Sequence, residues 1–219
     1  MGKGPGMLFL VLGMALVPVM AFGQGNTSVV NQEGTGNNAF QEQLATMFDS
    51  GSNYAYIEQV GAKHSAKQTQ DGKSNTATVY QNIAENGAIQ RQMGTNNTAN
   101  IRQEGAKNTA VQEQSPGGLG NETYQSYQKG WGNLAGITQN GTSNIARQNQ
   151  ESAYGATARI SQEGDSNQAI QVQTMAIGAV AIVSQIGSNN VSYQMQSGYG
   201  NMSTVYQNGR ANAATVIQK

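Results

Sequence analysis

Apolar and polar residues alternate along most of this chain with a period of two. Ala99, Ile101 and Gln103 lie at alternate positions, Gly105 follows, and the same spacing returns over the next eleven residues. This period is typical of a β-strand with one buried face. The glycine can adopt positive φ and let the chain reverse. The pattern predicts a strand, a tight arc and a second strand.

The phrase recurs from Gln32 to Gln218, with its closing glutamine usually repeating every eleven residues. Two places before that glutamine, a branched aliphatic residue alternates with glutamine, as in Ile101 and Gln112. The period is therefore 22 residues, with two kinds of strand in each coil. We predict an all-β fold, a β-solenoid of about eight strand–arc–strand coils with amyloid-like cross-β stacking. One sheet would have a Val/Ile ladder and the facing sheet a second Gln ladder.

Identical amides at equivalent positions are expected to stack into hydrogen-bonded ladders that join successive coils. The predicted ladder and assembly residues are Gln32, Asn37, Gln43, Gln59, Gln70, Asn75, Gln81, Gln92, Asn97, Gln103, Asn108, Gln114, Gln139, Asn144, Gln150, Gln162, Asn167, Gln173, Gln185, Asn190, Gln196, Asn201, Gln207, Asn212 and Gln218. The predicted turn glycines are Gly34, Gly61, Gly94, Gly105, Gly130, Gly141, Gly164, Gly187, Gly198 and Gly209.

Residues 1–23 interrupt the pattern and are predicted to be a secretory signal peptide. The segment has Lys3, then an apolar run of about sixteen residues that contains Gly13 and Pro18. The run is short for a membrane anchor and has no basic flank after it. The mature chain would begin at Gln24 and have no membrane span.

The mature chain divides into repeats 1–4 over 24–114 and repeats 5–8 over 133–219. Residues 115–132 begin with Ser-Pro-Gly-Gly and place Tyr127 where a glutamine would fall. We expect a loop excursion there rather than an irregular strand, because a strand would shift the phase of the two sheets. A second insert, at 44–52, is expected in a link between coils.

Composition narrows the class of protein. Charged residues make up 11% of the chain, the formal net charge is zero, and there is no cysteine. No basic face for nucleic acid is expected, and disulfides cannot stabilise the fold. The chain has one histidine, His64, in a position otherwise filled by asparagine, and Asp71 and Asp165 are the aspartates in the turns. We therefore predict no enzyme activity, no cofactor and no metal site.

Burial of apolar side chains cannot stabilise this composition by itself. Each small or branched side chain contributes about 1–3 kcal/mol, whereas ordering the backbone costs about 1–2 kcal/mol per residue. Backbone bonds between coils and amide ladders have to supply the rest, and they grow with each added coil. The terminal coils, 26–43 and 201–218, have no recognisable cap. The sequence favours polymerisation.

The phrase Q-x-G-x-x-N-x-A-x-x-x-Q resembles the repeat of curlin, the subunit of bacterial curli fibres. The resemblance covers essentially the whole mature chain, and seven of the eight repeats keep the glycine two places after the glutamine. It implies a secreted subunit that assembles with itself into functional amyloid on the cell surface, for adhesion and biofilm matrix. It also implies other curlin-type subunits and a dedicated outer-membrane export and nucleation machinery as partners.

Two alternatives remain at this point. Within the curlin family, the chain could be the minor nucleator instead of the bulk subunit, and the unusual last strand with Val216 keeps that role open. A protein of another class, a monomeric β-solenoid that binds ice or carbohydrate, would need one uniform outward rank. The outward residues here are mixed, with Thr98, Tyr80 and Arg102 among them.

Overall fold

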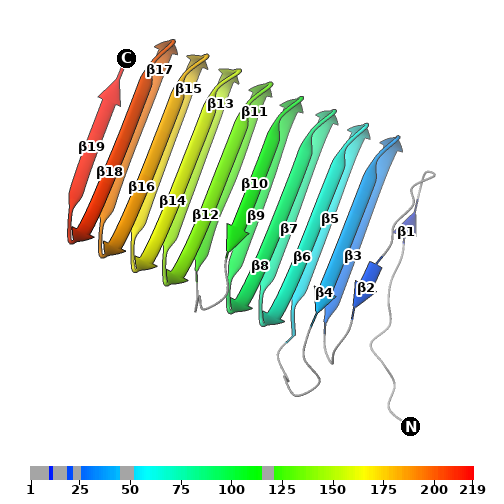
Figure 1. Cartoon of the computed structure of the whole chain (residues 1–219). Helices are drawn as coiled ribbons and strands as arrows, with labels where there is room; N and C mark the ends of the chain where they lie inside the picture. Colours follow the sequence, from blue (N-terminus) through cyan, green and yellow to red (C-terminus); the bar gives the residue numbers. More distant parts are fainter. Residues whose placement is uncertain (1–9, 12–18, 22–25, 45–51, 115–120) are drawn as a thin grey trace.

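The chain folds into two stacked parallel β-sheets that form a solenoid of about eight turns (Figure 1). The computed structural model describes residues 10–11, 19–21, 26–44, 52–114 and 121–219. All regular elements in this part of the chain are strands, and successive strands alternate between the sheets. The predicted all-β solenoid with two strands per coil is confirmed.

Sheet A is defined here as the ten-stranded sheet and sheet B as the nine-stranded one. The strands of sheet A, in spatial order, are β1 (Leu10–Val11), β3 (Thr27–Thr35), β5 (Tyr54–Ala62), β7 (Thr76–Ala84), β9 (Thr98–Ala106), β11 (Glu122–Trp131), β13 (Ile145–Tyr154), β15 (Gln168–Ile177), β17 (Val191–Tyr199) and β19 (Ala213–Gln218). Those of sheet B are β2 (Val19–Ala21), β4 (Asn38–Leu44), β6 (Ser65–Lys73), β8 (Gly87–Thr95), β10 (Thr109–Gln114), β12 (Leu134–Thr142), β14 (Thr157–Asp165), β16 (Val180–Ser188) and β18 (Met202–Arg210).

Every neighbouring pair of strands is parallel, and the repeats lie in register. In sheet A, Ile57 of β5 lies beside Val30 of β3 and Val79 of β7. Because side chains alternate between the faces of a strand, one register places all of the small and amide residues inside. Equivalent residues of successive coils therefore stack directly on one another.

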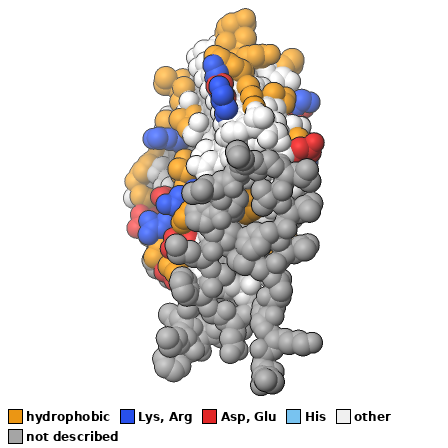
Figure 2. Space-filling view, turned by 90° about the vertical axis from the view of Figure 1, so that its right-hand side faces the viewer, with side chains coloured by type: hydrophobic (Ala, Val, Ile, Leu, Met, Phe, Trp, Pro, Cys, Tyr) orange, Lys and Arg blue, Asp and Glu red, His pale blue; other side chains and the backbone are white. Residues whose placement is uncertain are grey.

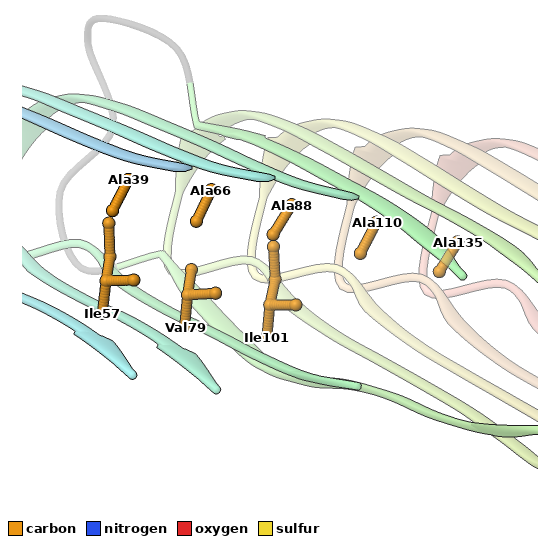
Figure 3. Close-up of a cluster of buried hydrophobic side chains, with 8 residues drawn as sticks. All are labelled: Ala39, Ile57, Ala66, Val79, Ala88, Ile101, Ala110 and Ala135. Carbon is orange, nitrogen blue, oxygen red and sulfur yellow. The ribbon is translucent and has the colours of Figure 1, made fainter. Parts of the chain in front are cut away.

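Small side chains fill the space between the sheets (Figure 3). In the first half, the branched residues Ile57, Val79 and Ile101 of sheet A face a row of alanines from sheet B that includes Ala66 and Ala88. A branched side chain opposite an alanine keeps the two sheets close together. This narrow core is why each coil buries little apolar area.

Residues 122–131 form a strand, so the predicted loop excursion at 115–132 is wrong over that range. β11 lies between β9 and β13 and pairs with both. A bulge of one residue between Thr123 and Ser126 restores the register, so that Gln128 lies between Gln103 and Gln150. Pairing on both edges satisfies backbone groups that a loop would leave open in the stack. Residues 115–120 lie outside the described residues.

Because β11 is an additional strand, the Val/Ile ladder and the second Gln ladder change sheets at this point. Val/Ile strands belong to sheet A as far as β9, but Ile137 of β12 stacks on Gln112 of β10 in sheet B. From there on, sheet B contains Ile160, Val183 and Val205. The prediction of one aliphatic and one glutamine sheet therefore holds within each half and is wrong for the whole chain.

The predicted signal peptide lies partly outside the described residues, as do residues 45–51 of the insert at 44–52. Within 1–23, the strands β1 and β2 pair in parallel with β3 and β4, at the start of the stack. The described residues include no helix of the length and hydropathy that a membrane crossing requires.

Candidate functional site: amide ladders and the ends of the stack

A ladder of closing glutamines runs through the whole of sheet A. Each Nε2 donates to the Oε1 of the next glutamine at 2.5 to 2.9 Å. The members are Gln32, Gln59, Gln81, Gln103, Gln128, Gln150, Gln173, Gln196 and Gln218.

The closing glutamines of sheet B form a second such ladder, with Nε2–Oε1 distances of 2.7 to 3.2 Å. Its members are Gln43, Gln70, Gln92, Gln114, Gln139, Gln162, Gln185 and Gln207. The same Nε2 also donates across the core, as from Gln70 to the carbonyl of Tyr54 at 3.0 Å. One amide group thus joins successive coils and also joins the two sheets.

The additional glutamines of the Gln strands stack in two separate runs. Gln41, Gln68, Gln90 and Gln112 form a run in sheet B. Gln148, Gln171 and Gln194 form another in sheet A. The run in sheet A begins at Gln148, because the neighbouring position in β11 is occupied by the buried Ser126.

Asparagines at one edge of the stack connect each coil to the next through backbone groups. The Oδ1 of Asn75 accepts from the backbone N–H of Asn97 at 3.0 Å, and its Nδ2 donates to the carbonyl of Gly94 at 3.0 Å. Both bonds go to the following coil. The residues in this row are Asn26, Asn53, Asn75, Asn97, Asn121, Asn144, Asn167, Asn190 and Asn212.

The opposite edge has a shorter row of the same kind, made by Asn37, His64, Asn86, Asn108 and Asn133. Ala156 and Ala179 then take the asparagine position. Their arcs contain the buried alanines Ala153 and Ala176, which pack with them into a small apolar cluster. At this edge, apolar packing replaces the amide row in two coils.

His64 occupies an asparagine position, as predicted. Its Nδ1 accepts from the backbone N–H of Asn86 at 3.3 Å, so the proton lies on Nε2, which donates to the carbonyl of Val60 at 3.1 Å. Burial lowers the pKa of the imidazole, although the bond to Val60 acts in the opposite direction. His64 is therefore a neutral structural residue of the row.

All ten predicted turn glycines have positive φ. A Cβ on Gly141 would lie 2.1 Å from the carbonyl oxygen of Gly164 in the next coil. No side chain fits there, because the stacked backbone occupies the space. Gly72, which the sequence prediction omitted, has the same geometry against Gly94.

Sequence reasoning missed several other ladder members. Gln128 and Asn121 were missed because they lie within the predicted loop excursion at 115–132. Asn53, Asn86 and Asn133 begin strands at the predicted spacing, and that spacing was the signal that identified their neighbours. The predicted residues, in contrast, all lie at inward or arc positions of the stack.

The outer surface has no uniform rank of side chains. One outward row of sheet B includes Lys67, Ile89, Val111, Gly136 and Arg159 in consecutive strands. Basic, acidic and hydrophobic side chains are interspersed on the face seen in Figure 2. No group of three or more potential metal ligands occurs among the residues that the structure describes.

A local cluster on sheet A combines charge and aromatic rings. Arg102 lies against the rings of Tyr80 and Tyr127, at 5.4 and 5.9 Å from the centroids. Its guanidinium also bonds to Glu104, and this raises the pKa of Arg102 and lowers that of Glu104. The cluster ties three coils together on the outside of the stack.

The two ends of the stack present complementary groups. At the first coil, the Oε1 atoms of Gln32 and Gln43 are buried without a hydrogen-bond partner. At the last coil, the Nε2 atoms of Gln207 and Gln218 donate across the core to the carbonyls of Val191 and Met202 in the preceding strands. Interior glutamines also donate to the next coil, but among the described residues no strand lies beyond β18 in sheet B or beyond β19 in sheet A. The last coil therefore has donors, and the first coil acceptors, for one further ladder step.

No protein-family model matches the chain, and no characterised protein matches it in sequence.

Proposed function

We propose that this chain is a secreted structural subunit that assembles end to end into curli-type functional amyloid fibres on the bacterial surface, for adhesion and biofilm matrix. The observation that supports this most is the geometry of the two ends. The same residue types that join interior coils lie at both ends of the stack, with glutamine acceptors at the first coil and glutamine donors at the last. A second copy supplies the missing partners.

The junction between two copies would be stabilised by the same interactions as two neighbouring interior coils. A new junction adds two strand pairings and two steps of the closing-glutamine ladders. A typical hydrogen bond contributes about 0.5–1.5 kcal/mol net, so the many bonds of one junction together outweigh the cost of association. An open parallel edge is a template for another strand. Soluble solenoids normally cover it with a cap.

The leader is part of this proposal. Cleavage after residue 23 removes β1 and β2, which pair with β3 and β4 in the uncleaved chain. The first coil then has a free edge. Export through a dedicated outer-membrane machinery, and association with other curlin-type subunits, follow from the curlin resemblance and belong to the same proposal.

The distribution of repeated residues favours assembly over a monomeric binding module. An ice- or carbohydrate-binding solenoid needs its regular rank on the outside, where a ligand reaches it. In this chain the regular ranks are buried, and the outward rows mix Lys67, Ile89 and Gly136. The remaining alternative within the family is the minor nucleator, and Val216 in place of a ladder glutamine at the last strand is the observation that favours it.

The test is assembly of purified residues 24–219 followed by thioflavin T fluorescence, with fibre diffraction of the product. We expect a lag followed by growth, and a reflection at about 4.8 Å along the fibre. A chain that stays monomeric and melts cooperatively would contradict the proposal. Seeding of a second curlin-type subunit at substoichiometric amounts, without fibres of its own, would identify the nucleator instead.

A further inference from the structure

The described part of residues 24–219 contains an odd number of strands. Without β1 and β2, the ten-stranded sheet A keeps nine strands and the nine-stranded sheet B keeps eight. The stack begins with β3 and ends with β19, and both belong to sheet A. The solenoid therefore has eight and a half coils, and the place that follows β19 along the winding lies in sheet B, beside β18.

We propose that successive copies are related by a half-turn about the solenoid axis, so that β3 of the incoming copy pairs with β18 and its β4 pairs with β19. This inference rests on the proposed function and specifies the register of the partner, which is a second copy of the chain. The two sheets exchange roles at every junction.

The half-turn is compatible with the direction of the strands. The chain reverses at each arc, so the strands of sheet A run opposite to those of sheet B, and pairing within each sheet is parallel. Rotation by a half-turn moves β3 to the side of sheet B and reverses its direction. It then lies parallel to β18 and continues the winding.

Stacking without rotation leaves a defect. β3 of the incoming copy would then pair with β19, and its β4 would lie in sheet B beyond β18. Because β4 follows β3 by half a coil, it would arrive one strand spacing beyond the free place beside β18. Each junction would contain an empty strand position in sheet B, with unpaired backbone on both sides.

The inward residues continue across the rotated junction. Gln207 and Gln218 would donate to the unpartnered Oε1 atoms of the incoming Gln32 and Gln43. Val30 would lie on Val205 and extend the aliphatic row of sheet B. Gln41 would lie on Val216, where the glutamine run of sheet A already ends.

The arcs agree with the same register. Interior turn glycines pack against a backbone carbonyl of the next coil. A Cβ added to Gly187 would lie 2.0 Å from the carbonyl oxygen of Gly209. Gly209 has the same φ of 113°, but an added Cβ would meet only the Nδ2 of Asn212, at 3.6 Å. In the rotated junction the carbonyl of the incoming Gly34 takes the vacant position.

Paired cysteines distinguish the two arrangements, because the chain has no cysteine of its own. When the copies are rotated, the register found between interior strands would place Val29 beside Thr204 and Phe40 beside Thr215. Without rotation, Thr215 lies beside Val29, whereas the empty strand position separates Thr204 from Phe40. Neighbours in adjacent strands are about 4.8 Å apart, within the range that a disulfide spans.

The experiment uses four double variants of residues 24–219, each assembled under reducing conditions, oxidised as fibres, dissolved and separated without reductant. We expect covalent multimers from Thr204→Cys with Val29→Cys and from Thr215→Cys with Phe40→Cys. Thr204→Cys with Phe40→Cys and Thr215→Cys with Val29→Cys are the matched controls and should run as monomers. Each single substitution occurs once in an expected and once in a control pair.

Cross-linking of Thr215→Cys with Val29→Cys in place of the two expected pairs, or equal cross-linking of all four variants, overturns the half-turn and leaves fibre formation intact. Absence of thioflavin T-positive fibres from the unmodified chain overturns the proposed function itself. Electron cryomicroscopy of unmodified fibres gives a second readout that needs no substitution. Consecutive subunits with sheets A and B on the same sides would contradict the inference.

Discussion

Single amide side chains in this protein bond in two directions. A closing glutamine such as Gln70 donates along the stack to Gln92 and across the core to Tyr54. Leucine would fill a similar volume but could make neither bond. The amides are therefore the residues that set the spacing of coils and the spacing of the sheets.

The turn glycine of the last coil tests the end-to-end contact with a single methyl group. Gly209→Ala should cost about 1–2 kcal/mol in the monomer for a side chain at positive φ, but it should stop fibre elongation because the added Cβ meets the incoming carbonyl. Elongation from preformed seeds, followed by thioflavin T, is the measurement. Gly200→Ala is the matched control, since Gly200 has a φ of 63° and no atom within 4 Å of an added Cβ. Equal elongation of both variants would count against the junction.

The buried histidine predicts a pH dependence of stability. His64 accepts a bond at Nδ1 as the neutral imidazole, and burial lowers its pKa below the ordinary value of 6.5. A lowered pKa in the folded state means that this contribution is fully present above about pH 6.5 and is lost as the pH falls through the folded pKa. We expect the urea midpoint of the monomer to fall between about pH 7 and pH 5.

His64→Asn supplies the control, because asparagine fills the equivalent position in Asn37 and Asn86. This variant should show a flatter midpoint over the same range. Glu104 also has a lowered pKa, from an ordinary 4.5, so its contribution is lost at lower pH than that of His64. An unchanged slope in the variant would assign the dependence to other groups.

At the scale of strands, β11 is the element that connects the two halves. Its register shift places Gln128 in the ladder, where it bonds to Gln103 and Gln150 at 2.8 and 2.9 Å. The same strand places Ser126 in the core between an isoleucine and a glutamine. It thereby separates the glutamine run of sheet B from that of sheet A.

Removal of the β11 glutamine should destabilise the monomer strongly. Gln128→Ala leaves the donor of Gln103 and the acceptor of Gln150 buried without this partner, at about 1–3 kcal/mol each. We expect a loss of about 2–6 kcal/mol in the free energy of unfolding, measured with urea at low protein concentration. Lys129→Ala, at the exposed neighbouring position, should change it by less than about 0.5 kcal/mol. A small effect of Gln128→Ala would show that the hydrogen bonds of Gln128 contribute little to the stability of the monomer.

The proposed cleavage after residue 23 predicts a difference between residues 1–219 and residues 24–219. β1 and β2 cover part of β3 and β4, so the uncleaved chain should add to fibre ends through only one of its own ends. Residues 1–219 should cap growth of residues 24–219 when added at a low ratio to seeded reactions. Growth at the unmodified rate would mean that the leader leaves the edge free.

At the scale of the whole molecule, the length of the solenoid determines how much each subunit would add to the proposed fibre. Eight and a half coils at about 4.8 Å per coil correspond to about 41 Å per subunit, and a half-turn makes the axial repeat about 82 Å. The sequence had suggested eight coils and a correspondingly shorter subunit. The additional half-coil comes from β11.

Mass per length, measured on unstained fibres by scanning transmission electron microscopy, tests this value. We expect one subunit for each 41 Å or so of a single protofilament, calculated from the coil spacing. Bundled fibres should give whole-number multiples of that density. A mass per length below one subunit for each 41 Å or so would require a partly unfolded subunit.

The sequence alone was sufficient for the repeat, the inward residues and the arcs. Ala99, Ile101 and Gln103 share one face by strand periodicity, and Gly105 lies where only a residue without a side chain fits against the next coil. These are local constraints, repeated every coil, so a period in the residues is enough to reveal them.

Only the tertiary structure decided which sheet contains the Val/Ile ladder in each half of the chain. Whether Glu122–Trp131 forms a strand depends on the open edges of β9 and β13, which lie far apart in the sequence and accept a one-residue bulge. The phrase around Ser126 and Tyr127 is irregular, so its own periodicity cannot indicate its place. Pairing on both sides satisfies its backbone, and that single strand determines which sheet contains Ile137, Ile160 and Val183.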